Sequence, residues 1–151
     1  MTVLLIIGGV VASLAIFNGL YPAITRSSTA ITSATAKLND RIESRIEIIQ
    51  VADNGTANVN IWVKNVGTSK IDGIERSDIF FGPETDFYRV TYGGAITPYW
   101  DYQLEGGNSE WKPTVTLKIT VHLASALSAG THLVKVIIPN GIFDETTFSV
   151  E

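Results

Sequence analysis

The chain has 151 residues, of which 45% are hydrophobic, with no cysteine and a net charge of −4. The acidic balance excludes a basic surface that binds nucleic acid through its phosphates, and the absence of cysteine excludes disulfides, thiol catalysis and thiolate metal sites. A chain of this length accommodates one membrane-associated helix and one further domain of about 100 residues.

The N-terminal segment is uncharged as far as Thr25, and its apolar run begins at Val3. As a helix, residues 3–24 would be about 33 Å long, close to the roughly 30 Å of a membrane hydrocarbon core. We therefore expect this segment to lie in lipid or inside a helical assembly. Because no Lys or Arg precedes it, we also expect that a basic leader was removed before Met1. A cleaved secretory signal ending near residues 34–36 is the alternative.

After Phe17, apolar residues continue at helical spacing, at Leu20, Ile24, Ile31, Leu38 and Ile42. Pro22 predicts a kink near residues 18–21, because proline lacks a backbone donor. The stretch 27–36 is rich in Ser, Thr and Ala, which favours close helix packing, with a flexible linker as the alternative. We expect the helix to end near residues 39–41 or a few residues later. This divides the chain into a helix and stalk over 1–43 and a β-domain over 44–151.

From Arg45 onward the apolar residues alternate with a period of two, which is typical of strands. The expected strands cover residues 46–51, 59–65, 78–81, 87–92, 114–122, 132–138 and 142–150. Asp53-Asn54-Gly55 and Asn140-Gly141 predict hairpin turns, because Asn-Gly tolerates the positive φ of tight turns. The expected fold is therefore α+β, with a long N-terminal hydrophobic helix followed by an antiparallel, Ig-like β-sandwich. A closed barrel is the alternative.

The sequence offers no nucleophile beside a base and no ordered metal cage, so we expect neither an enzyme nor a cofactor. His122 and His132 fall in or beside predicted strands and are interpreted as residues of the sheet surface. Four acidic residues are interpreted as solvated loop charges rather than calcium ligands, because they fit no EF-hand pattern. They are Glu84, Asp86, Asp144 and Glu145.

Six aromatic residues cluster in a loop-like stretch, namely Tyr88, Tyr92, Tyr99, Trp100, Tyr102 and Trp111. Core packing and subunit contact both explain such a cluster, and sugar stacking is a third alternative. We take Tyr99, Trp100 and Tyr102 as candidate subunit contacts. The tripeptide Asn54-Gly55-Thr56 matches the N-glycosylation acceptor pattern on an exposed turn, so Asn54 is a candidate glycosylation site.

Several short motifs carry a family resemblance. In the first half of the domain they are Asp40-Arg41-Ile42, Ile46-Glu47-Ile48 and Val63-Lys64-Asn65-Val66-Gly67-Thr68. In the second half they are Trp111-Lys112-Pro113 and the segment from Gly130-Thr131-His132 to Pro139-Asn140-Gly141. Together with the uncharged helix and the cysteine-free domain, they resemble archaeal type IV pilin-like proteins of the archaellum. This group comprises the archaellins and the accessory proteins FlaF and FlaG.

The resemblance implies a structural subunit of a motility filament, with helices bundled in the core, β-domains outside and torque transmitted along the fibre. The residues expected in the helical core are Leu5, Ile6, Val10, Leu14, Phe17, Leu20, Pro22, Ile24 and Ile31. The implied partners are further copies of the chain, the membrane platform and motor, and the surface-layer protein. The implied location is an extracellular filament, with membrane insertion before assembly. The alternative is a membrane-anchored accessory protein of FlaF or FlaG type, whose β-domain binds the surface layer as stator or cap.

Overall fold

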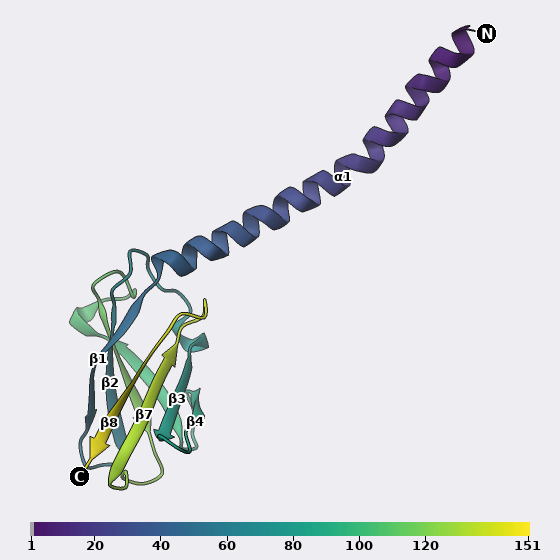
Figure 1. The fold of residues 1–151 in the computed structure, drawn as a ribbon. Helices are drawn as coiled ribbons and strands as arrows, with labels where there is room; N and C mark the ends of the chain where they lie inside the picture. Colours follow the sequence, from purple (N-terminus) through teal and green to yellow (C-terminus); the bar gives the residue numbers. More distant parts are fainter. Residues whose placement is uncertain (1) are drawn as a thin grey trace. The chain divides into compact units, whose positions relative to one another are not determined.

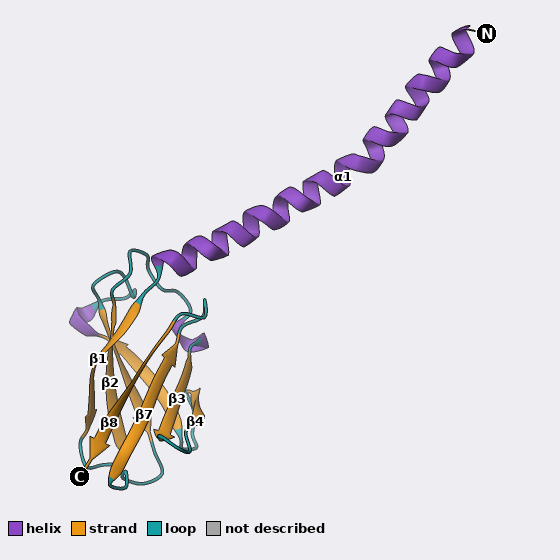
Figure 2. Ribbon diagram, viewed as in Figure 1, coloured by secondary structure: helices purple, strands orange, loops and turns teal. Residues whose placement is uncertain are grey.

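A computed structural model describes residues 2–151, except for the side chains of residues 5, 16–27, 30 and 40. The chain divides into two compact units, Met1–Asn39 and Asp40–Glu151, and each is described by itself. One helix, α1 (Thr2–Glu43), is followed by eight strands (Figures 1 and 2).

Helix α1 ends at Glu43, within the range that the sequence predicts. Hydroxyl groups along it donate to carbonyl groups one turn earlier, from Ser13 to Gly9 at 2.8 Å, and from Thr32 to Ser28 and Thr35 to Ile31 at 2.9 Å. The kink that Pro22 predicts concerns residues 18–21, which belong to the stretch whose side chains are not described. Among the residues that the structure describes, no helix combines the length and apolar character that crossing a membrane requires.

The strands are β1 (Ile46–Asp53), β2 (Asn58–Asn65), β3 (Asp78–Pro83), β4 (Tyr88–Tyr92), β5 (Tyr99–Leu104), β6 (Thr116–His122), β7 (Gly130–Ile137) and β8 (Phe143–Val150). Two short 3-10 helices, η1 (Ile74–Arg76) and η2 (Glu105–Gly107), lie before β3 and after β5. Strand β5 is the one that the sequence did not predict. Its aromatic and polar residues were interpreted as a loop, whereas they pair along the full length of the strand with β6.

The strands form one hydrogen-bonded sheet in the order β1-β2-β6-β5-β4-β3-β7-β8. All neighbours are antiparallel except β4 and β5, which are joined by two parallel pairs, Thr91 with Tyr99 and Tyr92 with Trp100. The sheet therefore has two four-stranded halves, β1-β2-β6-β5 and β4-β3-β7-β8. The predicted antiparallel sandwich is corrected in this respect, because a short parallel contact makes its two halves continuous.

The free edges of the two halves, β1 and β8, also lie next to each other (Figure 1). A side chain rather than a backbone ladder joins them, since the Ile48 N–H donates to Asp144 Oδ2 at 2.7 Å. A bulge between Ile48 and Gln50 interrupts the regular register of β1 at this point. A bulged edge offers no straight row of backbone groups, so the sheet is nearly closed without a complete ring of strand pairs.

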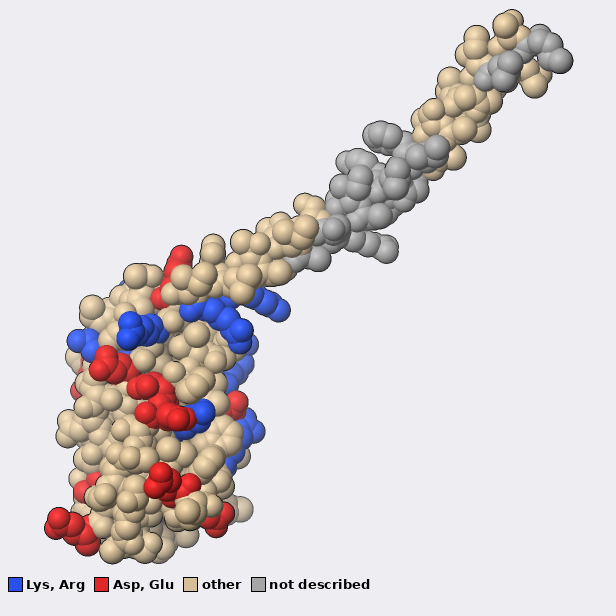
Figure 3. All heavy atoms as spheres, in the orientation of Figure 1, with Lys and Arg blue, Asp and Glu red and all other residues tan. Residues whose placement is uncertain are grey.

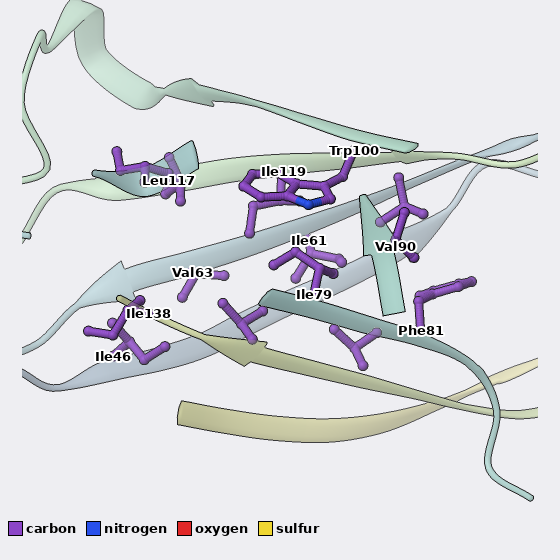
Figure 4. Close-up of a cluster of buried hydrophobic side chains, with 14 of the residues drawn as sticks. Ile46, Ile61, Val63, Ile79, Phe81, Val90, Trp100, Leu117, Ile119 and Ile138 are labelled. Carbon is purple, nitrogen blue, oxygen red and sulfur yellow. The ribbon is translucent and has the colours of Figure 1, made fainter. Parts of the chain in front are cut away.

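The core between the two halves is built from the inward row of each strand. In β2 and β6 these rows alternate strictly, with Val59, Ile61 and Val63 facing Val121, Ile119 and Leu117. Trp100, Phe81 and Ile79 fill the space from β5 and β3 (Figure 4). All of these side chains are at most 1% exposed, so the domain contains one continuous hydrophobic core.

Both predicted hairpin turns are confirmed. Gly55 lies between β1 and β2 with φ 67°, and its N–H donates to Asp53 Oδ1 at 3.1 Å. Gly141 lies between β7 and β8 with φ 87°, and its N–H donates to the Ile138 carbonyl at 2.8 Å. Both conformations favour glycine, because its lack of a Cβ removes the steric penalty at positive φ.

A buried amide at the end of β2 connects three parts of the domain. The side-chain nitrogen of Asn65 donates to the carbonyls of Ser69 and Trp111, at 2.9 and 3.0 Å. Its side-chain oxygen accepts from the Gly67 N–H at 3.0 Å. Asn65 is fully buried, so each of these bonds replaces contact with water.

The loop after Asn65 binds the chain where α1 ends. The Gly67 N–H donates to the Arg45 carbonyl at 3.0 Å, and the Thr68 N–H donates to the Glu43 carbonyl at 2.8 Å. Gly67 leaves no room for a larger residue, because an added Cβ would lie 2.7 Å from Arg45 N and still closer to the Glu43 carbonyl oxygen. We call residues 65–68 with residues 43–45 the clasp.

We expect Asn65→Ala to lower the free energy of unfolding by about 1–3 kcal/mol, because it leaves buried donor and acceptor groups without partners. Urea unfolding followed by circular dichroism measures the effect. The control is Asn108→Ala, whose exposed amide bonds only the Glu105 carbonyl, and which we expect to change stability much less. Equal stability of the two variants would contradict the role given to Asn65.

Candidate functional site

The histidines lie in two different environments. His122 is on the outer surface of β6, where its Nδ1 lies 2.9 Å from Asn58 Oδ1 and its Nε2 lies 3.0 Å from Asp101 Oδ2. Its ring stacks on Tyr99 with centroids 4.4 Å apart. His132 is 2% exposed and packs between Phe81 and Phe148, so its interpretation as a surface residue is wrong.

The four acidic residues that were considered as calcium ligands do not form a cluster. Asp144 accepts the Ile48 N–H across the β1–β8 edge, and Glu145 pairs with Lys135 at 2.8 Å. Across the residues described, no group of three or more His, Cys, Asp or Glu side chains is arranged to hold a metal ion.

The aromatic cluster divides between core and surface. Trp100 and Trp111 are 0% and 1% exposed, so both rings belong to the core and Trp100 offers no ring for a subunit contact. Tyr102 is partly exposed beside Trp100, and its hydroxyl donates to Glu75 Oε1. The pKa of Tyr102 is raised to about 12, first by this hydrogen bond to the carboxylate and to a smaller extent by partial desolvation. Contacts by Tyr99 and Tyr102 with another subunit stay a prediction.

The outer surface of β3, β7 and β8 carries apolar side chains in place of the expected polar ones. Phe143 and Phe87 are 53% and 46% exposed, and Phe87 meets Phe80 edge to face at 6.3 Å between centroids. Leu133 and Ile137 of β7 face outward in the same area. We call Phe80, Phe87, Leu133, Ile137 and Phe143 the apolar face. Exposed aromatic side chains grouped with apolar ones on one surface are typical of interaction sites.

Paired charges lie among the residues of the apolar face. Asp78 and Arg89 form an ion pair. Lys135 lies between Leu133 and Ile137 on the outward side of β7, and it bonds Glu145 while its Nζ lies 4.1 Å from the Phe143 ring centroid. Figure 3 shows acidic and basic side chains interspersed among uncharged ones on the side of β7 and β8. The sequence contained one signal for this face, since Leu133, Val134, Val136 and Ile137 make β7 apolar on both of its sides.

The opposite half of the sheet has a polar outer surface. Across β1, β2, β6 and β5, the register aligns Gln50, Trp62, Lys118 and Gln103 in one outward row. The Lys118 ammonium lies 5.7 Å from the Trp62 ring centroid. In the neighbouring row, the Thr120 hydroxyl donates to Asn60 Oδ1 at 3.2 Å. The two outer surfaces of the domain thus differ in chemistry.

The remaining predicted sites lie outside the sheet faces. Asn54 is exposed at the β1–β2 hairpin, and its glycosylation stays a prediction. In α1, the side chains of Ile6, Val10, Leu14 and Ile31 are between 55% and 66% exposed in the single chain. The other helix residues named above, Leu5, Phe17, Leu20, Pro22 and Ile24, have side chains outside the described part. The role of these nine residues in assembly stays a prediction.

Comparison with known proteins identifies a family and a relative of this chain. A model of archaeal-type flagellin matches residues 2–148. An uncharacterised protein of Archaeoglobus fulgidus is 32% identical over 157 residues, spanning 98% of this chain and 95% of that protein.

Two solved structures from Sulfolobus acidocaldarius are similar in fold. One is the archaellum periplasmic stator protein FlaG, with a TM-score of 0.64, 24% identity and coverage of 70% of this chain and 99% of that one. The other is a chain of the FlaF and FlaG stator complex, with a TM-score of 0.62, 25% identity and coverage of 68% and 87%. The chain is an archaellum-related structural protein rather than an enzyme, and it belongs to the archaeal-type flagellin family.

Proposed function

We propose that this chain is an accessory protein of the archaellum that acts as a stator-type component at the cell surface and does not form the repeating wall of the filament. Its likeness to a chain of the FlaF and FlaG periplasmic stator complex supports this role. The observation that carries the proposal is the apolar face. A stator has to be held by a second protein, and this face combines the exposed rings of Phe87 and Phe143 with paired charges that can orient a partner.

We assign the apolar face to a FlaF-type partner. Exposed Phe143 and Phe87 can fill pockets of that partner, as buried aromatic anchors do in most strong interfaces. The two ion pairs, Asp78 with Arg89 and Lys135 with Glu145, are mostly solvent-exposed, so they favour one orientation of the partner and add little affinity. No catalytic step is required of the domain in this role.

The described apolar residues of α1 serve attachment in this proposal. Ile6, Val10 and Leu14 expose more than half of their side chains in the single chain. Burying each of them stabilises an assembly by about 1.5–3 kcal/mol. We place this part of the helix in apolar surroundings within the archaellum assembly.

A repeating filament subunit is the second candidate function. The observation in its favour is the extent of the family match, which runs from residue 2 to residue 148 and includes both the helix and the β-domain. In that case α1 would pack against copies of itself, and the apolar face would meet a neighbouring copy. The two candidates differ in the identity of the partner, which the next experiment tests.

We expect Phe143→Asp in the full chain to weaken binding of the FlaF-type protein from the same organism by about tenfold or more, because a carboxylate replaces an aromatic anchor. Isothermal titration or co-purification measures the binding. Ser149→Asp is the matched control, because it places the same charge on the same outward row of β8, away from the apolar face. Unchanged binding by Phe143→Asp would exclude this face as the docking surface.

We expect Leu14→Lys to release the chain from the archaellum assembly and to abolish swimming, because an unpaired ammonium in apolar surroundings costs several kcal/mol. Leu14→Met is the control, since it conserves volume and apolar character. Cell fractionation and motility assays follow the two variants. If cells with Leu14→Lys swim normally and retain the chain, α1 is not buried at this position.

A further inference from the structure

The outer surface of β1, β2, β6 and β5 carries a set of side chains that the proposed function does not use. We call Gln50, Trp62, Lys64, Lys118 and Gln103 the Trp62 face. Trp62 is the one tryptophan that reaches this surface, because Trp100 and Trp111 are at most 1% exposed. An indole ring lying on a sheet presents a flat apolar surface with a polar edge, which suits a ligand that has both characters.

The two lysines of this face lack acidic partners. In the described part of the chain, Lys70, Lys112 and Lys135 each have a carboxylate within 4.0 Å, whereas Lys64 and Lys118 have none. Glu47 is opposite Lys64 in the register but makes no ion pair with it. Lys118 is directly opposite Trp62 and its Nζ lies 5.7 Å from the ring centroid, while Lys64 is two residues along β2 on the same outward side. Two unpaired cations in a chain of net charge −4 complement an anionic ligand.

Neutral hydrogen-bonding groups complete the surface. Gln50 and Gln103 are at the two ends of the row that contains Trp62 and Lys118. Across four strands at about 4.8 Å spacing this row is roughly 14 Å long. Each amide offers a donor and an acceptor side by side, which matches the adjacent hydroxyl groups of a sugar. An extended peptide would instead pair with the backbone of a strand edge, whereas these side chains project from the surface of the sheet.

We propose that the Trp62 face binds an acidic oligosaccharide. A hexuronic acid residue lies on the Trp62 ring, its carboxylate lies between the Lys64 and Lys118 ammonium groups, and its neighbours bond Gln50 and Gln103. The proposal is independent of the apolar face, because the two sets of residues are on opposite halves of the sheet. It gives the domain a second surface that can hold a glycosylated cell surface while the first holds a protein.

The test titrates the full chain, dispersed in mild non-ionic detergent at low salt, with trigalacturonic acid. Tryptophan fluorescence reports Trp62, since the other two indoles are buried. We expect a saturable change in tryptophan fluorescence with trigalacturonic acid. Neutral trigalactose and a triglutamate peptide should each bind at least tenfold more weakly. By isothermal titration, the double variant Lys64→Gln/Lys118→Gln and the single variant Trp62→Ala should each bind trigalacturonic acid at least tenfold more weakly.

Lys135→Gln is the matched control, because it removes one lysine from the other half of the sheet and should leave sugar binding unchanged. Circular dichroism confirms that each variant is folded. Absence of binding at millimolar trigalacturonic acid would overturn the proposal. Equal binding of triglutamate would show a general anion or peptide surface instead, and equal binding of trigalactose would remove the role of the two lysines.

Discussion

The clasp around Asn65 is the constraint on which the rest of the domain depends. A single buried amide bonds the loop after β2 and the segment at Trp111, while the loop itself bonds the carbonyls of Glu43 and Arg45. The chain therefore enters β1 in one position as soon as α1 ends. Because a side-chain period of two allows no slip of one residue, that entry point also sets which residues of β1 face the core. Residues 65–68 of the clasp lie within the motif Val63–Thr68, which gives the family resemblance of this segment a physical reason.

From this fixed start, the sheet closes around its core with two weak connections. The parallel contact of β4 with β5 has two residue pairs, and the edge between β1 and β8 is held by Asp144. Each half keeps its own outer surface, and the two surfaces differ, since one is apolar with paired charges and the other carries Trp62 with unpaired lysines. A domain of this kind suits a protein that connects two different materials. This is the property that an archaellum stator requires.

Much of the fold could be predicted from the sequence, because local signals determine it. Alternation located seven strands, and Asn-Gly pairs located the hairpins at Gly55 and Gly141. Strand β5 was missed because its burial depends on pairing with β6, which is distant in sequence, and not on a regular pattern of its own. The burial of His132 was missed for the same reason, whereas core packing was one of the alternatives left open for Trp100. The apolar face required knowledge of the register, since Phe80, Ile137 and Phe143 become neighbours only when three strands are aligned.

The central claim is that this chain is a stator-type component and not the building block of the filament. The most direct measurement is the number of copies of the chain per archaellin subunit, obtained by quantitative mass spectrometry of archaella purified with their basal assemblies. Our account predicts a few copies per archaellum, retained with the basal assembly and absent from sheared filaments. If sheared filaments contain as many copies of this chain as of the archaellin subunit, or more, the account is contradicted and the chain is a filament subunit.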